Sequence, residues 1–326
     1  MRLLVALLLV GLALGACGEQ RGAFLDEYVA DDGRVVRHDQ GGDTVSEGQA
    51  YAMLLAVAER DEQRFERVWT WTREHLRRPD GLLSWRWADG RVVDAEPASD
   101  ADLDAARALM VAAKRFGEPR YAEEGEALGR AIGEHETALA TGKTVLVAGP
   151  WAQGRPVVNP SYFSPRAFAA IGRGDLSGTS RLLADRLMAD GLPPDWAVVE
   201  PWGVVPTGPP SGGEAIYSYD AVRLPIRLAE SCRAEDRALA ARLWPRLREQ
   251  PGAVRRALDG TPLSEDEHAV ALAGAAAAAH AAGDRAAASE LLDRAAQLDE
   301  ERPSYYGSAW VALTRAMLQD GALGSC

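Results

Sequence analysis

Amphipathic helices follow one another along almost the whole sequence, and this constrains the fold more than any other feature. In the segment 46–60, for example, Ala50, Met53, Leu54 and Val57 are apolar and share one face only if the segment is helical. The same spacing predicts about twelve helices, at 24–29, 46–60, 64–76, 100–116, 121–139, 164–173, 177–189, 216–231, 234–249, 268–282, 286–298 and 305–319.

The predicted helices come in pairs that are joined by short turns. Gly or Pro ends many of them, as at Gly117 and Pro119, which are normal helix stops. Only the segments 82–87, 144–147 and 198–205 look extended, and they do not alternate with helices as they would in a βαβ fold. We therefore predict one all-α domain whose paired helices close into a ring, with an open helical solenoid as the alternative.

The charge balance excludes one class of function. The 326 residues include 36 Lys and Arg against 48 Asp and Glu, a net charge of −12, whereas nucleic-acid binders show a basic excess. With 47% hydrophobic and 26% charged residues, the chain is not of the disordered class. The histidines and cysteines have no metal-binding spacing. We expect no metal, no other cofactor and no nucleic-acid partner.

The first residues are predicted to be a targeting signal. An apolar run from Leu3 to Ala16 follows Arg2. It is short for a membrane span, which needs roughly 20 residues, but it fits the apolar core of a secretion signal. The run ends in Leu14-Gly15-Ala16-Cys17, which resembles the bacterial lipobox whose cysteine is lipidated. An ordinary secretion signal is the alternative.

This interpretation makes residues 1–17 a lipoprotein signal peptide and residues 18–326 a single domain. Lipid on Cys17 would anchor the domain to a membrane of the bacterial envelope, as a periplasmic or outer-membrane lipoprotein. Outside a reducing cytoplasm, Cys232 and Cys326 could form a disulfide. The alternative is one buried thiol and one thiol at a frayed terminus, and we prefer this second interpretation.

Carboxylates stand at the starts of several predicted helices. Glu47 follows Ser46, Asp100 opens a helix with two further acids in its first turn, and Asp220 precedes Arg223 by three residues. Each placement alone is explained by the helix dipole or by capping. In a closed ring, however, alternate helix starts meet at one mouth. Two carboxylates on either side of a bond are what glycoside hydrolysis requires.

Aromatic residues are frequent in the predicted loops. They are Trp85, Trp87, Trp151, Tyr162, Trp196, Trp202 and Tyr219. The apolar face of a sugar ring stacks on an aromatic face, so these residues favour a carbohydrate groove. Some of them must belong to the core, because large aromatics are usually mostly buried.

Four segments, in order, resemble glycoside hydrolase family 8, the family of bacterial cellulases. They begin at Val45 (VSEGQAYAM), Ala98 (ASDADL), Asn159 (NPSYF) and Tyr217 (YSYDAVRLP), and the resemblance covers about residues 24–318. It implies an (α/α)6 barrel and hydrolysis with inversion at the anomeric carbon.

The resemblance also implies roles for individual residues. Glu47 is expected to be the general acid and Asp220 the general base, while Asp100 binds and distorts the sugar at the point of cleavage. The cleft is expected to be lined by Trp85, Tyr162, Tyr219 and Arg223. Trp87 is an alternative to Trp85.

The resulting hypothesis is an inverting endo-β-1,4-glucanase that hydrolyses a cellulose-like polysaccharide. The chain looks most like the cellulases that accompany bacterial cellulose synthesis, so a polysaccharide synthesis or export complex is an expected partner. One alternative is a chitosanase or another β-glycan hydrolase of the family. Another is a non-catalytic lipoprotein that binds glucan and scaffolds such a complex. The Gly- and Pro-rich segment 206–213 departs from the family pattern and leaves the polymer open.

Overall fold

The computed structural model describes residues 22–318, 321–324 and 326. The expected signal peptide, residues 1–17, and its cysteine, Cys17, lie outside the described residues. Within the described part of the chain, no helix is both long enough and apolar enough to cross a membrane.

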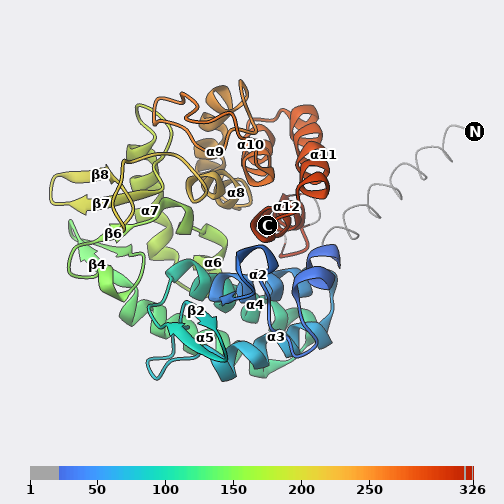
Figure 1. Cartoon of the computed structure of the whole chain (residues 1–326). Helices are drawn as coiled ribbons and strands as arrows, with labels where there is room; N and C mark the ends of the chain where they lie inside the picture. The colour runs from blue at the N-terminus through green and yellow to red at the C-terminus, as the bar shows by residue number, and fades with distance from the viewer. Residues whose placement is uncertain (1–21, 319–320, 325) are drawn as a thin grey trace, which may run out of the picture.

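Six helices stand around the centre of the molecule (Figure 1). They are α2 (Ser46–Glu59), α4 (Ser99–Phe116), α6 (Pro165–Ala170), α8 (Leu224–Ala229), α10 (Ala269–Ala281) and α12 (Tyr305–Leu318). Each contacts the next in this order, and α12 contacts α2. The ring is therefore closed as predicted, and the open solenoid is excluded because its first and last helices would not meet.

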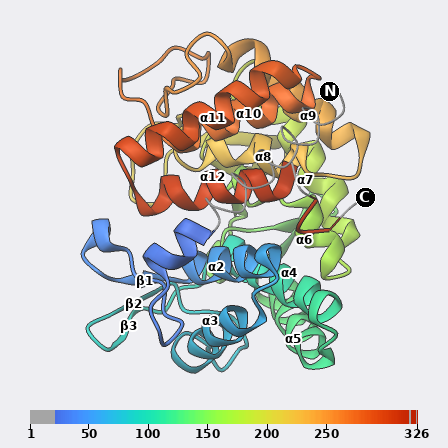
Figure 2. The ribbon, with the colours of Figure 1, turned by 90° about the vertical axis from the view of Figure 1, so that its right-hand side faces the viewer.

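An outer layer of helices covers this ring. It consists of the helical residues 22–28 and of α3 (Glu62–His75), α5 (Pro119–His135), α7 (Gly174–Leu187), α9 (Ala234–Leu247) and α11 (Arg285–Glu301). Figure 2 shows α11 of this layer running beside α10 and α12 of the ring. An inner helix that packs on both sides must be apolar all round, and every residue from Ala269 to Ala279 of α10 is buried. The fold is the predicted (α/α)6 barrel.

Short antiparallel strands form three small sheets in the connections. Their order is β1 (Thr44–Val45), β2 (Arg86–Ala88) and β3 (Arg91–Asp94) in the first, β4 (Thr137–Ala140) and β5 (Lys143–Leu146) in the second, and β6 (Val157–Val158), β7 (Trp196–Glu200) and β8 (Gly203–Thr207) in the third. Of the extended segments predicted from sequence, 144–147 falls on β5, 198–205 spans the hairpin of β7 and β8, and 82–87 overlaps β2 only at its last two residues. The helix predicted over 121–139 is too long, because its last residues pair as β4.

The helix predicted over 216–231 is also too long. It begins only at Leu224, after a 3-10 turn, η4 (Ala221–Arg223). The preceding Tyr217 pairs with Arg256 in an isolated β-bridge, so this part of the chain is extended. Pro225 lies in the first turn of α8, where its missing N–H is not needed.

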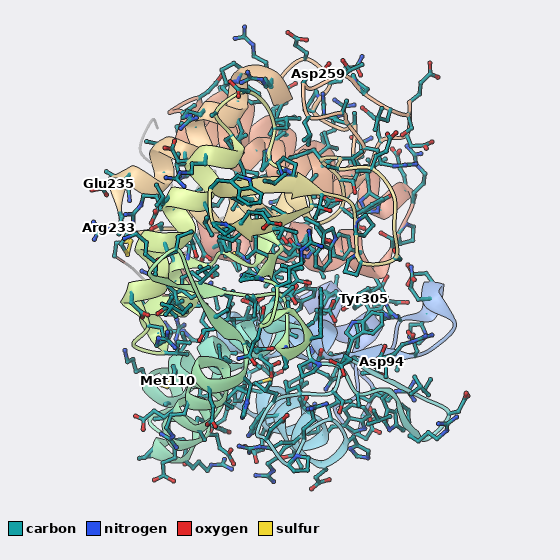
Figure 3. All side chains as sticks on the ribbon, turned by 90° about the vertical axis from the view of Figure 1, so that its left-hand side faces the viewer. Asp94, Met110, Arg233, Glu235, Asp259 and Tyr305 are labelled. Atoms are coloured by element: carbon teal, nitrogen blue, oxygen red, sulfur yellow. A yellow bond between two sulfur atoms is a disulfide. The ribbon has the colours of Figure 1, made fainter. Side chains whose placement is uncertain are left out.

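The two ends of the barrel differ. In Figure 3, Tyr305 at the start of α12 and Asp94 at the end of β3 lie at one end, whereas Met110 of α4 and Arg233 before α9 lie at the other. The inner helices all begin at the first of these ends, which we call the mouth. Polar groups at helix starts therefore gather there.

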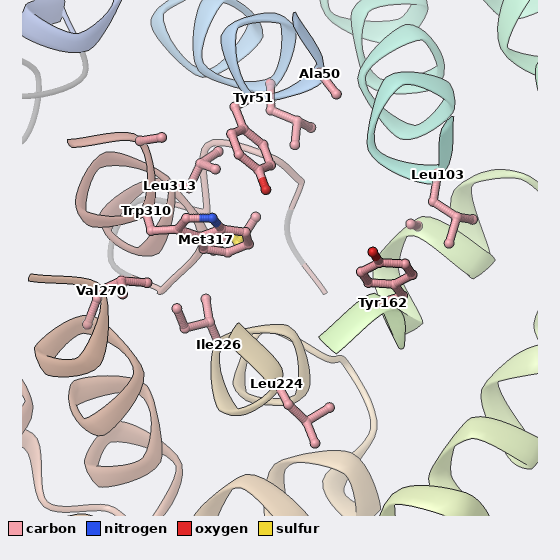
Figure 4. Packing of buried hydrophobic residues seen from close by; sticks show 14 of the residues in the cluster. Ala50, Tyr51, Leu103, Tyr162, Leu224, Ile226, Val270, Trp310, Leu313 and Met317 are labelled. Atoms are coloured by element: carbon pink, nitrogen blue, oxygen red, sulfur yellow. The ribbon is translucent and has the colours of Figure 1, made fainter. Parts of the chain in front are cut away.

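The centre of the barrel is filled with side chains from the inner helices. Figure 4 shows Tyr51, Leu103, Ile226 and Trp310 pointing toward the middle from four different helices. The rings of Tyr51 and Trp310 meet edge to face, with centroids 5.4 Å apart, a favoured aromatic geometry. The middle of the barrel is thus a packed core.

Three ion pairs connect α4 to α8 and the adjoining turns, one helical turn apart. They are Asp100–Arg223, Asp104–Arg227 and Arg107–Glu230. All six side chains are at most 3% exposed. We refer to these pairs as the ionic ladder. Its uppermost pair lies at the mouth.

Cys232 and Cys326 form a disulfide, so the preferred prediction of two separate thiols is wrong. Their Cα atoms are 5.3 Å apart, within the usual range for a disulfide. The two residues are 94 positions apart in the sequence, and only the closing of the ring brings the chain end back beside the turn after α8. Arg166 of α6 bridges this region, since its guanidinium donates to the carbonyl of Gly324 at 2.7 Å.

Candidate active site

A cleft of about 410 Å³ opens at the mouth. Glu47, Tyr219, Asp220 and Arg223 of the predicted site line it directly. The other predicted residues contact these four or lie beneath them, as described below. The fold therefore brings together side chains that are up to 176 positions apart in sequence, from Glu47 to Arg223.

Glu47 lies in the first turn of α2. The next residue is Gly48, where an added Cβ would lie 2.5 Å from the Tyr305 hydroxyl, so the missing side chain makes room for the Tyr305 ring. The indole Nε1 of Trp85 donates a hydrogen bond of 3.0 Å to Glu47 Oε2. Desolvation, followed by the nearby charge of Asp100, raises the pKa of Glu47 to about 7. A carboxyl with this pKa can hold a proton near neutral pH and donate it.

Trp85 rather than Trp87 contacts Glu47. Regular alternation would place Trp85 and Trp87, two residues apart, on the same face of a strand. The pairing of β2 with β3 is irregular between Arg86 and Trp87, however, and Trp87 lies against α3 instead. There it packs edge to face on Trp71 at 5.4 Å and carries the Arg34 guanidinium 4.6 Å from its ring centroid. The prediction of Trp85 over its neighbour agrees with this geometry.

Arg223 connects the two predicted carboxylates at the centre of the site. Its Nη1 donates to Asp100 Oδ2 at 2.8 Å and to the Tyr51 hydroxyl at 3.2 Å. Its Nη2 donates to Asp220 Oδ1 at 2.6 Å and to Ser161 Oγ at 2.7 Å. A buried guanidinium held by four acceptors is fixed in position, so it fixes Asp100 and Asp220 relative to each other.

Asp220 is the more accessible of these two acids. Its side chain is 29% exposed, against 3% for Asp100. Burial raises the pKa of Asp220, Arg223 lowers it, and the charge of Asp195 raises it again. The outcome is a pKa above the usual range for an aspartate, which makes its carboxylate a better proton acceptor.

The three acids at the start of α4 have three different partners. Asp100 binds Arg223, and Asp104 binds Arg227. Asp102 is buried and accepts the backbone N–H of Leu83 at 2.9 Å. The excess of acids over what capping needs is thus explained by contacts to other elements, and Asp100 is the one that faces the site.

Two tyrosines complete the predicted set in different ways. Tyr162 in the 3-10 turn η3 (Pro160–Tyr162) is only 8% exposed; burial, followed by the charges of Asp100 and Asp220, raises its pKa. Its ring also lies 5.4 Å from the Arg223 guanidinium that holds both acids. Tyr219 is 43% exposed at the rim, where the hydroxyl of Tyr306 donates to its carbonyl at 2.7 Å.

The sequence matches the family model described as glycosyl hydrolases family 8 over residues 2–319. The chain belongs to this family. An endoglucanase of Xanthomonas axonopodis pv. citri is 34% identical over 247 residues, which cover 68% of this chain and 63% of the relative. A probable endoglucanase of Novacetimonas hansenii is 34% identical over 231 residues, covering 65% of this chain and 66% of the relative. The chain thus spans slightly less than two thirds of these curated relatives.

The fold of this family 8 chain is also similar to solved structures. The endo-β-1,4-glucanase CMCax from Acetobacter xylinum superimposes with a TM-score of 0.77 at 28% identity. The superposition covers 93% of this chain and 97% of that chain. Nearly the whole described barrel therefore has a counterpart in that enzyme.

Several cleft residues of this family 8 chain were not predicted from the sequence. Tyr305 and Tyr306 at the start of α12 and His268 before α10 line the cleft. A Ser-Tyr-Tyr sequence at the start of an inner helix is a signal that could have indicated the first two. Asp195 lies in a loop before β7 and has no such signal.

Metal ligands are not grouped in the described residues, in which no cluster of three or more His, Cys, Asp or Glu side chains could hold an ion.

Proposed function

We propose that this family 8 chain is an endo-β-1,4-glucanase that cleaves cellulose-like polysaccharide with inversion. One observation carries the proposal. Two carboxyl groups lie in the same cleft, and one of them, Glu47, has a pKa of about 7 while the other, Asp220, is held by Arg223. Paired acids in different environments are suited to act as proton donor and proton acceptor. The names of the two endoglucanase relatives support the choice of glucan.

The proposed reaction is a direct displacement by water. Glu47 gives its proton to the glycosidic oxygen as the bond to the anomeric carbon breaks. Asp220 takes a proton from a water molecule, whose oxygen bonds to the same carbon from the opposite face. The products are one sugar with a new reducing end and one with a free hydroxyl. A base bound to Arg223 alone would be weak, and the raised pKa of Asp220 supports its assignment as base.

The remaining predicted residues bind the polymer in this proposal. Asp100, fixed by Arg223, holds the sugar at the point of cleavage, and the exposed ring of Tyr219 offers a stacking face at the rim. Trp85 orients the Glu47 carboxyl through its indole N–H. The proposal needs no cofactor.

The location is a separate part of the proposal. We infer from the lipobox-like sequence ending in Cys17 that residues 18–326 form a catalytic domain tethered to the bacterial envelope. Tethering would place the enzyme beside a polysaccharide synthesis or export complex. Labelling of the protein with a radioactive fatty acid, lost in Cys17→Ser, tests the anchor independently of activity.

Chitosan is a second candidate substrate, favoured by the charges of the cleft. Four acidic side chains line it, Asp39, Glu47, Asp195 and Asp220, against Arg37 and Arg223. A cationic polymer would be attracted to such a lining. The comparison of relatives weighs more in favour of neutral glucan, since those described above are named endoglucanases.

The deciding experiment measures reducing-end release from carboxymethylcellulose, mixed-linkage glucan and chitosan in parallel. We expect cutting of carboxymethylcellulose, with losses of about 10²–10⁴-fold in Glu47→Gln and Asp220→Asn. Glu74→Gln and Asp190→Asn, at exposed positions, are the matched controls. NMR of the first product should show the inverted anomer. If only chitosan is cut, chitosan takes the place of glucan as the proposed substrate. If folded protein binds glucan but cuts none of the polymers, the proposal that the chain is an enzyme is refuted.

A further inference from the structure

Asp195 forms an unusual set of contacts for a loop residue. Its Oδ1 accepts the backbone N–H groups of Ser218 and Ala221, both at 2.8 Å. Its Oδ2 accepts the Ser218 hydroxyl, and its own N–H donates to the carbonyl of Ile216 at 2.8 Å. One side chain thus holds both sides of the turn that carries Asp220.

These contacts replace a cap that the turn lacks. Asp220 occupies the N-cap position of η4, where an aspartate normally accepts a backbone N–H of the helix that it opens. Here Asp220 makes no such bond, and α8 has no side-chain cap either. The N–H of Ala221, the first residue of η4, goes to Asp195 instead. The carboxyl of Asp220 is therefore released from a structural task and remains available in the cleft.

Asp195 also contributes charge. It accepts three hydrogen bonds at its two carboxyl oxygens, which suits an ionised carboxylate. Burial raises its pKa above the ordinary value, and these bonds offset that rise only in part. Asp195 lines the cleft together with Asp220, and like charges at close range hinder each other's ionisation. Its effect on Asp220 is opposite to that of Arg223.

Other ionisable groups around the pair are few and come from known elements. Those that face Asp220 are Arg223 on its own turn, Asp100 of α4, Tyr162 of η3 and Tyr306 of α12. Those near Asp195 are Arg223, Tyr217 and, in an adjoining cavity of about 320 Å³, Glu214 and Arg255. Asp195 is the acid that contacts the turn itself.

We propose that Asp195 is the positioning residue of the general base: it caps the turn in place of Asp220 and keeps the Asp220 carboxylate a strong proton acceptor despite Arg223. The inference rests on the proposed function, in which Asp220 is the base. It adds a residue that acts through Asp220 and does not itself touch the reacting atoms.

The test compares Asp195→Asn with Asp195→Ala in the whole protein. Asparagine keeps an oxygen acceptor for the two backbone N–H groups but removes the charge. For Asp195→Asn we expect the acidic limb of the kcat/KM profile on carboxymethylcellulose to move down by roughly one pH unit. The basic limb, which reports Glu47, should stay in place, with KM little changed. Asp195→Ala also frees the turn and should lower kcat by roughly 10²-fold.

The exposed Asp190, five residues earlier, gives the matched control, and Asp190→Asn should behave as wild type. An unshifted acidic limb in folded Asp195→Asn would overturn the proposal, as would wild-type kcat in Asp195→Ala. If Asp195→Ala does not fold, the pH profile of Asp195→Asn still tests the proposal.

A second readout does not depend on turnover. The ¹³C NMR titration of the Asp220 carboxyl should give a lower pKa in Asp195→Asn than in the wild type. Wild-type protein that cuts no polymer would refute the proposed function, whereas an unchanged Asp220 titration would refute the role of Asp195.

Discussion

The close packing of α10 on the turn that carries Asp220 and Arg223 leads to a quantitative prediction. Gly274 of α10 lies against this turn, and a Cβ added there would be 2.4 Å from the carbonyl oxygen of Val222. This is about 1 Å short of ordinary van der Waals contact. The obstacle is backbone, not the end of a flexible side chain, so Gly274→Ala must displace either α10 or η4.

The two effects of the substitution have opposite signs. Alanine in place of glycine in a helix interior stabilises by about 0.5–1 kcal/mol, whereas overpacking costs typically about 1–3 kcal/mol. We therefore expect a net loss of roughly 1–2 kcal/mol in the free energy of unfolding. The effect on rate should be larger, because a displacement of about 1 Å at a catalytic group can cost 10²-fold.

The assay pairs urea unfolding, followed by tryptophan fluorescence, with kcat on carboxymethylcellulose. Gly178→Ala in α7 is the matched control, since its Cβ would meet nothing within 4 Å. We expect that control to keep wild-type activity and gain about 0.4–1 kcal/mol in stability. If Gly274→Ala is as stable and as active as Gly178→Ala, the argument from close approach is wrong.

Three further predictions concern the ionic ladder, the disulfide and two buried acids. Arg227→Met leaves Asp104 without its partner at 1% exposure and should cost about 3–5 kcal/mol in chemical denaturation; a loss below about 1 kcal/mol would contradict this. Cys232→Ser opens a disulfide between residues 94 positions apart and should lower stability by about 4–5 kcal/mol in the chain-entropy account, whereas an unchanged Tm would argue against it. Burial raises the pKa of both Asp102 and Glu136, so the folded state keeps protons that the unfolded chain releases above about pH 4. Stability from these groups should fall as pH rises through their folded pKa values, and the fall in Tm should be smaller in Asp102→Asn; parallel curves for the two proteins would refute this.

The sequence predicts those parts of the fold that depend on neighbouring residues. Apolar spacing within a segment locates the inner helices, because the period of a helix is a local property. Acids such as Glu47 and Asp100 can be recognised as candidate site residues because they stand at helix starts. A closed ring of helices brings such starts together. The helix over 216–231 was overextended for the same reason, since its apolar spacing does not show that Tyr217 pairs with Arg256.

The contacts that the sequence does not reveal are those between distant segments. Asp195 meets Ser218 and Ala221 across a hairpin, and no local pattern distinguishes it from other loop acids. The disulfide from Cys232 to Cys326 depends on where the closed ring leaves the chain end. In each case the position of two helices or loops relative to one another decides the contact, and a single sequence carries no direct record of it.

The order of signs in the ionic ladder has a consequence for how the barrel assembles. In the upper two pairs the acid lies on α4 and the base lies in or just before α8. The third pair is reversed, because here α4 carries the base, Arg107, and the acid, Glu230, directly follows α8. If the two helices slid by one turn, Arg107 would meet Arg227 in a dry interior, where like charges repel strongly. If all three pairs had the acid on α4, a slip by one turn would still bring acids opposite bases. The reversed third pair makes such a slip unfavourable. The ionic ladder therefore disfavours an alignment of α4 with α8 that is shifted by one turn. It thereby also fixes the position of Asp100 beside Arg223.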